Sequence, residues 1–160
     1  MLIGAVINID CDRMEKLLEP EQLRRGKEFH RLVQGDWAGG VADAPALPEH
    51  TIWFTALPWR GTRIRRGRID IFIDKIDDFV SVVEIKATNW DAVKPRNRRK
   101  LLGSHRRQVL RYVDKYLDDD GVNVCAGIIY PRSPHSPGLK EEVETYLNDH
   151  ALQVVWYEDE

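Results

Sequence analysis

Two carboxylates and a lysine are the residues of this chain whose types and spacing best support chemistry. Asp70 lies in one apolar run, and Glu84-Ile85-Lys86 ends the next run fourteen residues later. If residues 77 and 78 turn an antiparallel hairpin, Asp70 lies opposite a residue close to Glu84, so the two carboxylates converge. Such a pair suits a hard divalent cation, and the lysine can orient an attacking water or stabilise a phosphoryl transition state.

Strand alternation gives these groups their expected directions. It predicts Ile69, Ile71 and Ile73 on one face and Asp70, Phe72 and Asp74 on the other. In the next strand, Glu84 and Lys86 project side by side from the face opposite Val83 and Ile85. The simplest alternative is that Glu84 and Lys86 only neutralise each other as an ion pair. The facing Asp70 argues against that alternative, because buried charges need partners.

The elements that must position these residues follow from hydrophobic periodicity. We expect a short helix from residue 13 and a longer helix from about residue 20 to residue 34, then a loop over 35–50 that is rich in Gly, Ala, Pro and Asp. Strands are expected over 51–57, 62–75, 79–87, 122–130 and 152–157, and further helices over 97–117 and 139–148. Asp118 to Gly121 is expected to stop the helix over 97–117. Hairpin strands followed by crossover helices predict an α/β fold, a mixed sheet with helices on both faces. A length of 160 residues fits one domain.

Asp70 and Glu84-Ile85-Lys86 together resemble the signature of the PD-(D/E)XK nuclease superfamily, whose core is restriction-endonuclease-like. Two further pieces resemble its RecB-type branch: Gly26-Lys27-Glu28-Phe29-His30 matches the GxxxH helix motif, and Gln108 to Tyr112 matches the QxxxY motif. All four pieces stand in the expected order. Ile69 replaces the proline that often precedes the aspartate, a change that this branch tolerates.

The resemblance implies a role for each matching residue. The metal ligands are His30, Asp70, Glu84 and the carbonyl of Ile85, with Mg²⁺ or Mn²⁺ as the ion, and Lys86 orients the water. Asp70, Glu84 and Lys86 are thus the expected catalytic residues. Glu28 is a rival of His30, but the two lie about 200° apart around a helix, so only one can point inward. Gln108 and Tyr112, one turn apart, are suited to contact a phosphate, a base or the carboxylates; a buried tyrosine on a core face is the alternative.

Basic residues gather in two acid-free runs that hold half of the 24 lysines and arginines, although the net charge is only -2. Residues 60–68 carry five arginines, and residues 94–107 carry seven bases. Both runs are expected to flank the cleft mouth and to hold DNA phosphates without reading sequence, whereas solvated surface is the plain alternative. The expected substrate-binding bases are Arg66, Arg68, Arg98, Arg99, Arg106 and Arg107, and His105 is a further candidate for phosphate contact.

Tryptophans and cysteines complete the set of candidate residues. Trp53, Trp59 and Trp90 could stack on unpaired bases, but ordinary burial is the preferred expectation for all three. Cys11 and Cys125 are expected to be buried thiols. Two cysteines cannot supply the four-cysteine iron–sulfur cluster that many RecB-type relatives carry.

The expected function is metal-dependent hydrolysis of DNA. The chain has no apolar run long enough to span a bilayer and no signal peptide, so a cytoplasmic protein without a membrane partner is predicted. No helicase is present, which leaves a standalone nuclease, a homo-oligomer or an enzyme recruited by a separate protein. The alternatives are a nucleic-acid-binding module without turnover and a nuclease that acts on RNA.

Overall fold

The computed structural model describes residues 21–40, 46–56, 63–76, 79–117 and 123–159. Within these ranges, a helix leads into a three-stranded antiparallel unit, and helices alternate with strands after it. The elements in chain order are α2 (Glu21–Gly40), β1 (Ala46–Ala56), β2 (Arg63–Ile76), β3 (Phe79–Ile85), the 3₁₀ turn η1 (Trp90–Ala92), α3 (Pro95–Leu117), β4 (Asn123–Tyr130), α4 (Pro137–Asn148), β5 (Gln153–Trp156) and the 3₁₀ turn η2 (Tyr157–Asp159).

The five strands form one sheet in the order β1-β2-β3-β4-β5. The pairs β1–β2 and β2–β3 are antiparallel, whereas β3–β4 and β4–β5 are parallel. The parallel pairs follow from the crossover helices α3 and α4, because a parallel neighbour needs a long return connection. The mixed sheet predicted from the sequence is therefore confirmed.

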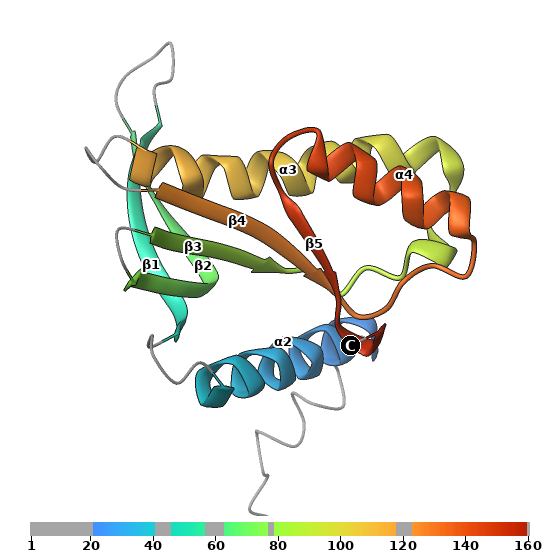
Figure 1. The fold of residues 1–160 in the computed structure, drawn as a ribbon, viewed down its shortest axis with the longest axis horizontal. Coiled ribbons are helices and arrows are strands. Elements are labelled where there is room, and N and C mark those ends of the chain that lie inside the picture. The colour runs from blue at the N-terminus through green and yellow to red at the C-terminus, as the bar shows by residue number, and fades with distance from the viewer. Residues whose placement is uncertain (1–20, 41–45, 57–62, 77–78, 118–122, 160) are drawn as a thin grey trace, which may run out of the picture.

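Helices cover both faces of this sheet (Figure 1). On one face, Val33 of α2 packs with Ile71, Ile85 and Ile129. On the other face, α3 and α4 bury a larger apolar core against the strands. The α3 and α4 side chains in this core include Leu102, Val109, Val143 and Leu147. The two faces of the sheet are thus covered by different helices, which leaves the strand ends as the positions where polar side chains can lie close together.

The boundaries differ from the prediction chiefly in the segment over 35–50. That segment was expected to be a loop, but α2 continues to Gly40 and β1 already begins at Ala46. Tertiary contacts extend the helix: Trp37 packs against the α2-side core, and Asp36 accepts a hydrogen bond from Tyr157. Contacts of this kind override the weak helix propensity of glycine.

Strict alternation fails around Asp70. Ile69 packs in the core under α3 and α4, whereas Ile71 and Ile73 pack on the α2 side, so the three isoleucines do not share a face. The change of face occurs opposite Glu49 of β1, whose φ of 57° lies in the left-handed region. A non-glycine residue rarely adopts that region, and here it marks an irregularity in the β1–β2 ribbon beside the candidate site.

Several expectations fall outside the described residues. These are the short helix from residue 13, the turn at residues 77 and 78, the helix stop at 118–121, and the side chains of Trp59, Asp74 and Cys11. Across the ranges that are described, no helix has the length and apolar character needed to cross a membrane.

Candidate active site

The candidate site forms where β2 and β3 separate, next to Asp70. The pair Ile71–Val83 still belongs to the ladder between these strands. Beyond it, the backbone N–H of Ile85 donates to Asp70 Oδ2 at 2.8 Å. Gln34 of α2 donates its side-chain amide to the backbone carbonyl of Asp70 at 3.0 Å. Side chains thus replace the ladder here, which fixes the Asp70 carboxylate beside β3 and attaches α2 to the same point.

Glu84, Lys86 and Gln108 form a compact hydrogen-bonded cluster on the α3 side of this point. Lys86 Nζ donates to Glu84 Oε1 at 2.6 Å and to Gln108 Oε1 at 2.8 Å. The Gln108 amide N–H₂ also donates to Glu84 Oε1. The Glu84-Ile85-Lys86 tripeptide at the end of β3 and the Gln108 motif of α3 are therefore in direct contact. The glutamate and lysine project side by side, as the strand alternation predicts.

Glu84 lies in an environment that disfavours its charge. The residue is only 2% exposed. Burial, and then the negative charge of Asp70, raise the pKa of Glu84 to about 7, against the opposing effect of Lys86. Its second oxygen, Oε2, is buried and has no hydrogen-bond partner among the described residues. Two adjacent carboxylates with one free buried oxygen form an arrangement that a cation would stabilise.

His30 approaches the same carboxylates from α2. Its Nδ1 lies 3.7 Å from Asp70 Oδ1, and the imidazole is about one-third exposed. Burial lowers the pKa of His30, and Lys86 and Arg68 add to this effect while Asp70 opposes it. A lowered pKa keeps the ring neutral at neutral pH, the form in which histidine ligates metals. Glu28, the rival candidate, is exposed and pairs with Arg24 at 3.8 Å, away from Asp70.

The donors at this point fit a divalent cation by their chemistry. Carboxylate oxygens from Asp70 and Glu84, together with a backbone carbonyl such as that of Ile85, are ligands that Mg²⁺ and Mn²⁺ accept, and Mn²⁺ also tolerates imidazole. The unpartnered Glu84 Oε2 is the observation that favours this fit. Among the residues that the structure describes, no three His, Cys, Asp or Glu side chains are already spaced as ligands around one point.

Tyr112 contacts this cluster through Gln108. The tyrosine is 6% exposed, and its hydroxyl oxygen accepts a long hydrogen bond of 3.4 Å from the Gln108 amide. Direct contact with a substrate, which the sequence allowed for both residues, is therefore not open to Tyr112 in this structure. The alternative of a buried tyrosine on a core face describes Tyr112, while half-buried Gln108 links it to Lys86 and Glu84.

The predicted phosphate-binding arginines divide into two groups. Arg66 and Arg68 are exposed on β2, within four residues of Asp70, and Arg99 and Arg107 are exposed on α3. Arg98 and Arg106 instead contact the α4 side. Arg98 donates to the Val93 carbonyl at 3.4 Å and lies 4.0 Å from Glu142, and Arg106 donates to His150 Nε2 at 2.5 Å. The contacts of Arg98 and Arg106 thus direct both side chains toward α4, and their role in binding phosphate stays a prediction.

Three further expectations need correction. His105 does not face phosphate: it is buried and hydrogen-bonded to the Tyr130 hydroxyl at 2.9 Å, and burial lowers its pKa to about 4. Cys125 is exposed rather than buried. Trp90 is buried as expected, but Trp53 is 59% exposed, contrary to the preferred expectation.

Sequence reasoning missed two residues that complete the site. One is Gln34, for which the sequence does carry a signal: it follows His30 by four residues and so shares its helix face. The other is Glu49, which falls in the segment expected to be a loop. It lies in β1 opposite Asp70, pairs with Arg68 at 3.4 Å, and lines the same hollow as His30 and Gln34. No local pattern signals Glu49, because its position depends on the pairing of β1 with β2.

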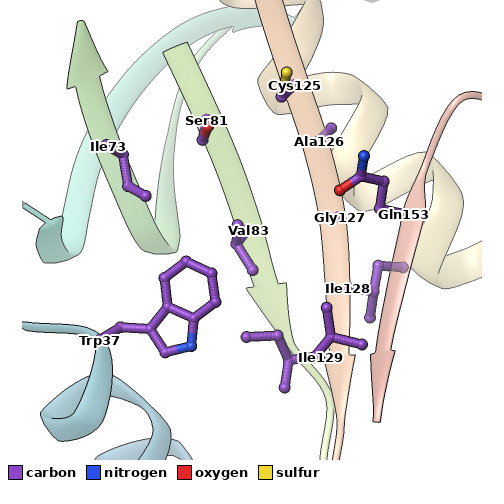
Figure 2. Close-up of a pocket in the computed structure, with 11 residues that line it drawn as sticks. Trp37, Ile73, Ser81, Val83, Cys125, Ala126, Gly127, Ile128, Ile129 and Gln153 are labelled. Carbon is purple, nitrogen blue, oxygen red and sulfur yellow. The ribbon is translucent and has the colours of Figure 1, made fainter. Parts of the chain in front are cut away.

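A separate apolar hollow lies on the α2 side of the sheet, away from the carboxylates. Figure 2 shows Trp37 of α2 beside this hollow, with Val83, Cys125, Gly127 and Ile129 among the strand residues that line it. None of the candidate catalytic residues lines it. This hollow therefore adds nothing to the chemistry of the site.

No protein-family model matches the chain, and a search of curated proteins finds no match. The resemblance to PD-(D/E)XK nucleases therefore stays a prediction that rests on the motif residues.

Proposed function

We propose that this chain is a metal-dependent nuclease of the PD-(D/E)XK type that hydrolyses phosphodiester bonds of DNA. One observation carries the proposal: Asp70 and Glu84 bring two carboxylates together at the end of β3, with Lys86 bonded to Glu84 and with Glu84 Oε2 left without a partner among the described residues. An ion pair that served only to neutralise Glu84 would not explain why a second buried carboxylate, that of Asp70, lies close to it.

Each residue of the cluster has a definable task. Lys86 has three N–H donors, of which Glu84 and Gln108 account for two, so the third can hold a water or a phosphate oxygen. Gln108 fixes the direction of the lysine, and Asp70 is fixed by the Ile85 N–H. Asp70, Glu84 and the Ile85 carbonyl would hold the ion, with His30 beside them. When bound, the metal would act as a Lewis acid and favour hydroxide formation from water.

Exposed bases on β2 and around the start of α3 support a polyanionic substrate. Arg66 and Arg68 precede Asp70 on β2, and Lys94, Arg96 and Lys100 line a groove beside the N-terminal part of α3. Groups of this kind bind phosphates without reading bases. DNA is the substrate we propose, in the cytoplasm, with a second copy or a recruiting protein as the candidate partners. An RNA nuclease and a binding module without turnover are the alternatives to test.

The test is a cleavage assay with linear, circular, single-stranded and double-stranded DNA and with RNA. Each substrate is incubated with Mg²⁺, with Mn²⁺ or with EDTA. The proposal predicts DNA cleavage that requires the metal and that is lost in Asp70→Ala and in Lys86→Ala, with circular dichroism showing that both variants fold. Binding without cleavage in every metal would favour the module, and cleavage restricted to RNA would change the substrate. Activity that survives both substitutions would contradict the mechanism.

A further inference from the structure

An exposed tryptophan on the β1–β2 ribbon stands out on the surface beside the site. Trp53 is 59% exposed, although tryptophan is highly buried on average. Its neighbour along the strand, Ile52, faces the opposite way and is 4% exposed in the core under α3 and α4. The ribbon is thus anchored through Ile52, and the indole of Trp53 is presented to solvent on the other face.

Arginines share this face with Trp53. In the antiparallel register, Trp53 pairs with Arg66 and Thr51 pairs with Arg68. Directly paired residues place their Cβ atoms about 5 Å apart on the same face, and Arg66 and Arg68 lie about 7 Å apart along the strand. Arg66 is exposed. The ion pair of Arg68 with Glu49 leaves both side chains more than half exposed, so a phosphate can compete for the guanidinium.

The strand face that carries Trp53, Arg66 and Arg68 adjoins the candidate site. Arg68 lines the hollow that also contains His30 and Gln34. Arg66 precedes Asp70 by four positions, which is about 13 Å along an extended strand. The Trp53 indole beside Arg66, then Arg68, and then the Asp70 carboxylate therefore follow one another along the β1–β2 ribbon.

We propose that Trp53, Arg66 and Arg68 form a docking surface for an unpaired polynucleotide strand, with one base stacked on the Trp53 indole and its phosphates on the arginines. The proposal rests on the proposed nuclease function and specifies its substrate. Bases in a duplex have their faces covered by their neighbours, so a flat aromatic platform selects a strand whose bases are free. The arginines supply the electrostatic part of the affinity.

The experiment measures binding of labelled oligothymidylate, oligouridylate and a duplex in EDTA by fluorescence anisotropy, so that no cleavage is required. We expect Trp53→Ala to weaken single-strand binding about ten- to a hundredfold and duplex binding much less. Trp53→Phe, which keeps an aromatic ring, should retain most of the affinity. Leu47→Ala removes another exposed apolar side chain of β1 and serves as the matched control, with unchanged binding. The two oligonucleotides distinguish a DNA strand from an RNA strand.

Three results would overturn the proposal. Trp53→Ala could leave single-strand binding unchanged, it could weaken duplex binding to the same extent, or sedimentation could reveal a dimer of the free protein that Trp53→Ala dissociates. The last result would assign the surface to a second copy of the chain. The binding measurement needs no turnover. If the protein binds single strands through Trp53 but never cleaves them, the proposed nuclease function is wrong and the proposed docking surface is still supported.

Discussion

At the scale of single residues, the most informative group is the Glu84 carboxyl. Its pKa of about 7 reflects burial and the neighbouring Asp70, and the unfolded chain has no such environment. Between pH 4.5 and 7 the folded protein therefore holds a proton that the unfolded chain has released. Stability must fall as pH rises through this window, because the folded state binds more protons there.

The corresponding prediction concerns Glu84→Gln, a neutral side chain of the same shape. In EDTA, the wild type should lose about 3 kcal/mol of unfolding free energy from this group between pH 4.5 and 7, and the variant should lack that loss. Urea unfolding of both proteins at pH 5 and pH 8 measures the difference. His105 contributes in the opposite direction below pH 6.5 but is common to both proteins, so subtracting the two curves isolates Glu84.

A metal control sharpens the same experiment. At pH 8, Mg²⁺ should stabilise the wild type, because an ion that binds only the folded state adds free energy, and should stabilise Glu84→Gln less. Glu141→Gln, at an exposed position of α4, should behave like the wild type throughout. A pH dependence that is equal in wild type and Glu84→Gln would show that Glu84 does not carry a raised pKa.

Residue identities at the site were predictable to a large degree, whereas their surroundings were not. Strand alternation predicts that Glu84 and Lys86 share a face, and these two residues come together here with His30, Asp70 and Gln108. At Asp70, however, strict alternation fails. Their metal and catalytic roles stay predictions. The directions of Arg98 and Arg106 depend on where α4 packs against α3, which no local pattern encodes.

At the scale of elements, α2 is the helix whose docking controls the site. Val33 is fully buried against the sheet, one turn after His30 on the same side of the helix. Gln34 then hydrogen-bonds to the Asp70 carbonyl. Removing the apolar packing of Val33 should therefore loosen the polar groups on both sides of it.

Substitution of Val33 tests the docking of α2, with the neighbouring Leu32 as the control. Val33→Ala should cost about 2 kcal/mol of stability in thermal or urea unfolding, since it removes buried apolar groups and leaves a cavity. It should also weaken Mg²⁺ binding, because His30 and Gln34 lose their fixed positions. Leu32→Ala removes a side chain that is 54% exposed and should change neither quantity measurably. Equal effects of the two substitutions would show that α2 is not docked as described.

The strands and helices were predicted closely where periodicity is strong, as in β2, β4 and α3. The segment over 35–50 was missed because its order depends on distant partners. Trp37 packs against the same buried cluster as Ile73 and Val155, and β1 forms by pairing with the edge of β2. The face change at Asp70 has the same origin, since Glu49 lies opposite it in the neighbouring strand.

At the scale of the whole molecule, the distribution of charge matters more than its sum. The net charge is only -2, yet the groove beside α3 is lined by three basic residues, Lys94, Arg96 and Lys100. If this groove carries DNA phosphates, its contribution must be independent of sequence and sensitive to salt.

The prediction is a change in the salt dependence of binding. The double variant Arg96→Ala/Lys100→Ala should reduce the slope of log affinity against log salt by about 0.9 for each duplex phosphate that the protein no longer neutralises, on any DNA sequence. Lys115→Ala, near the other end of α3, removes one positive charge far from the groove and should leave the slope unchanged. Anisotropy titrations in EDTA over a range of salt concentrations measure all three slopes. An unaltered slope in the double variant would exclude the groove from the DNA path.

The proposed function depends on whether the cluster of Asp70, Glu84 and Lys86 hydrolyses DNA with the help of a metal. The most direct measurement is the single-turnover cleavage rate of labelled DNA in Mg²⁺ for wild type, Lys86→Ala and the exposed-lysine control Lys115→Ala. We predict that Lys86→Ala is at least about a hundredfold slower, that Lys115→Ala matches the wild type, and that EDTA abolishes all activity. Equal rates for wild type and Lys86→Ala, or cleavage that persists in EDTA, would contradict metal-dependent hydrolysis at this cluster.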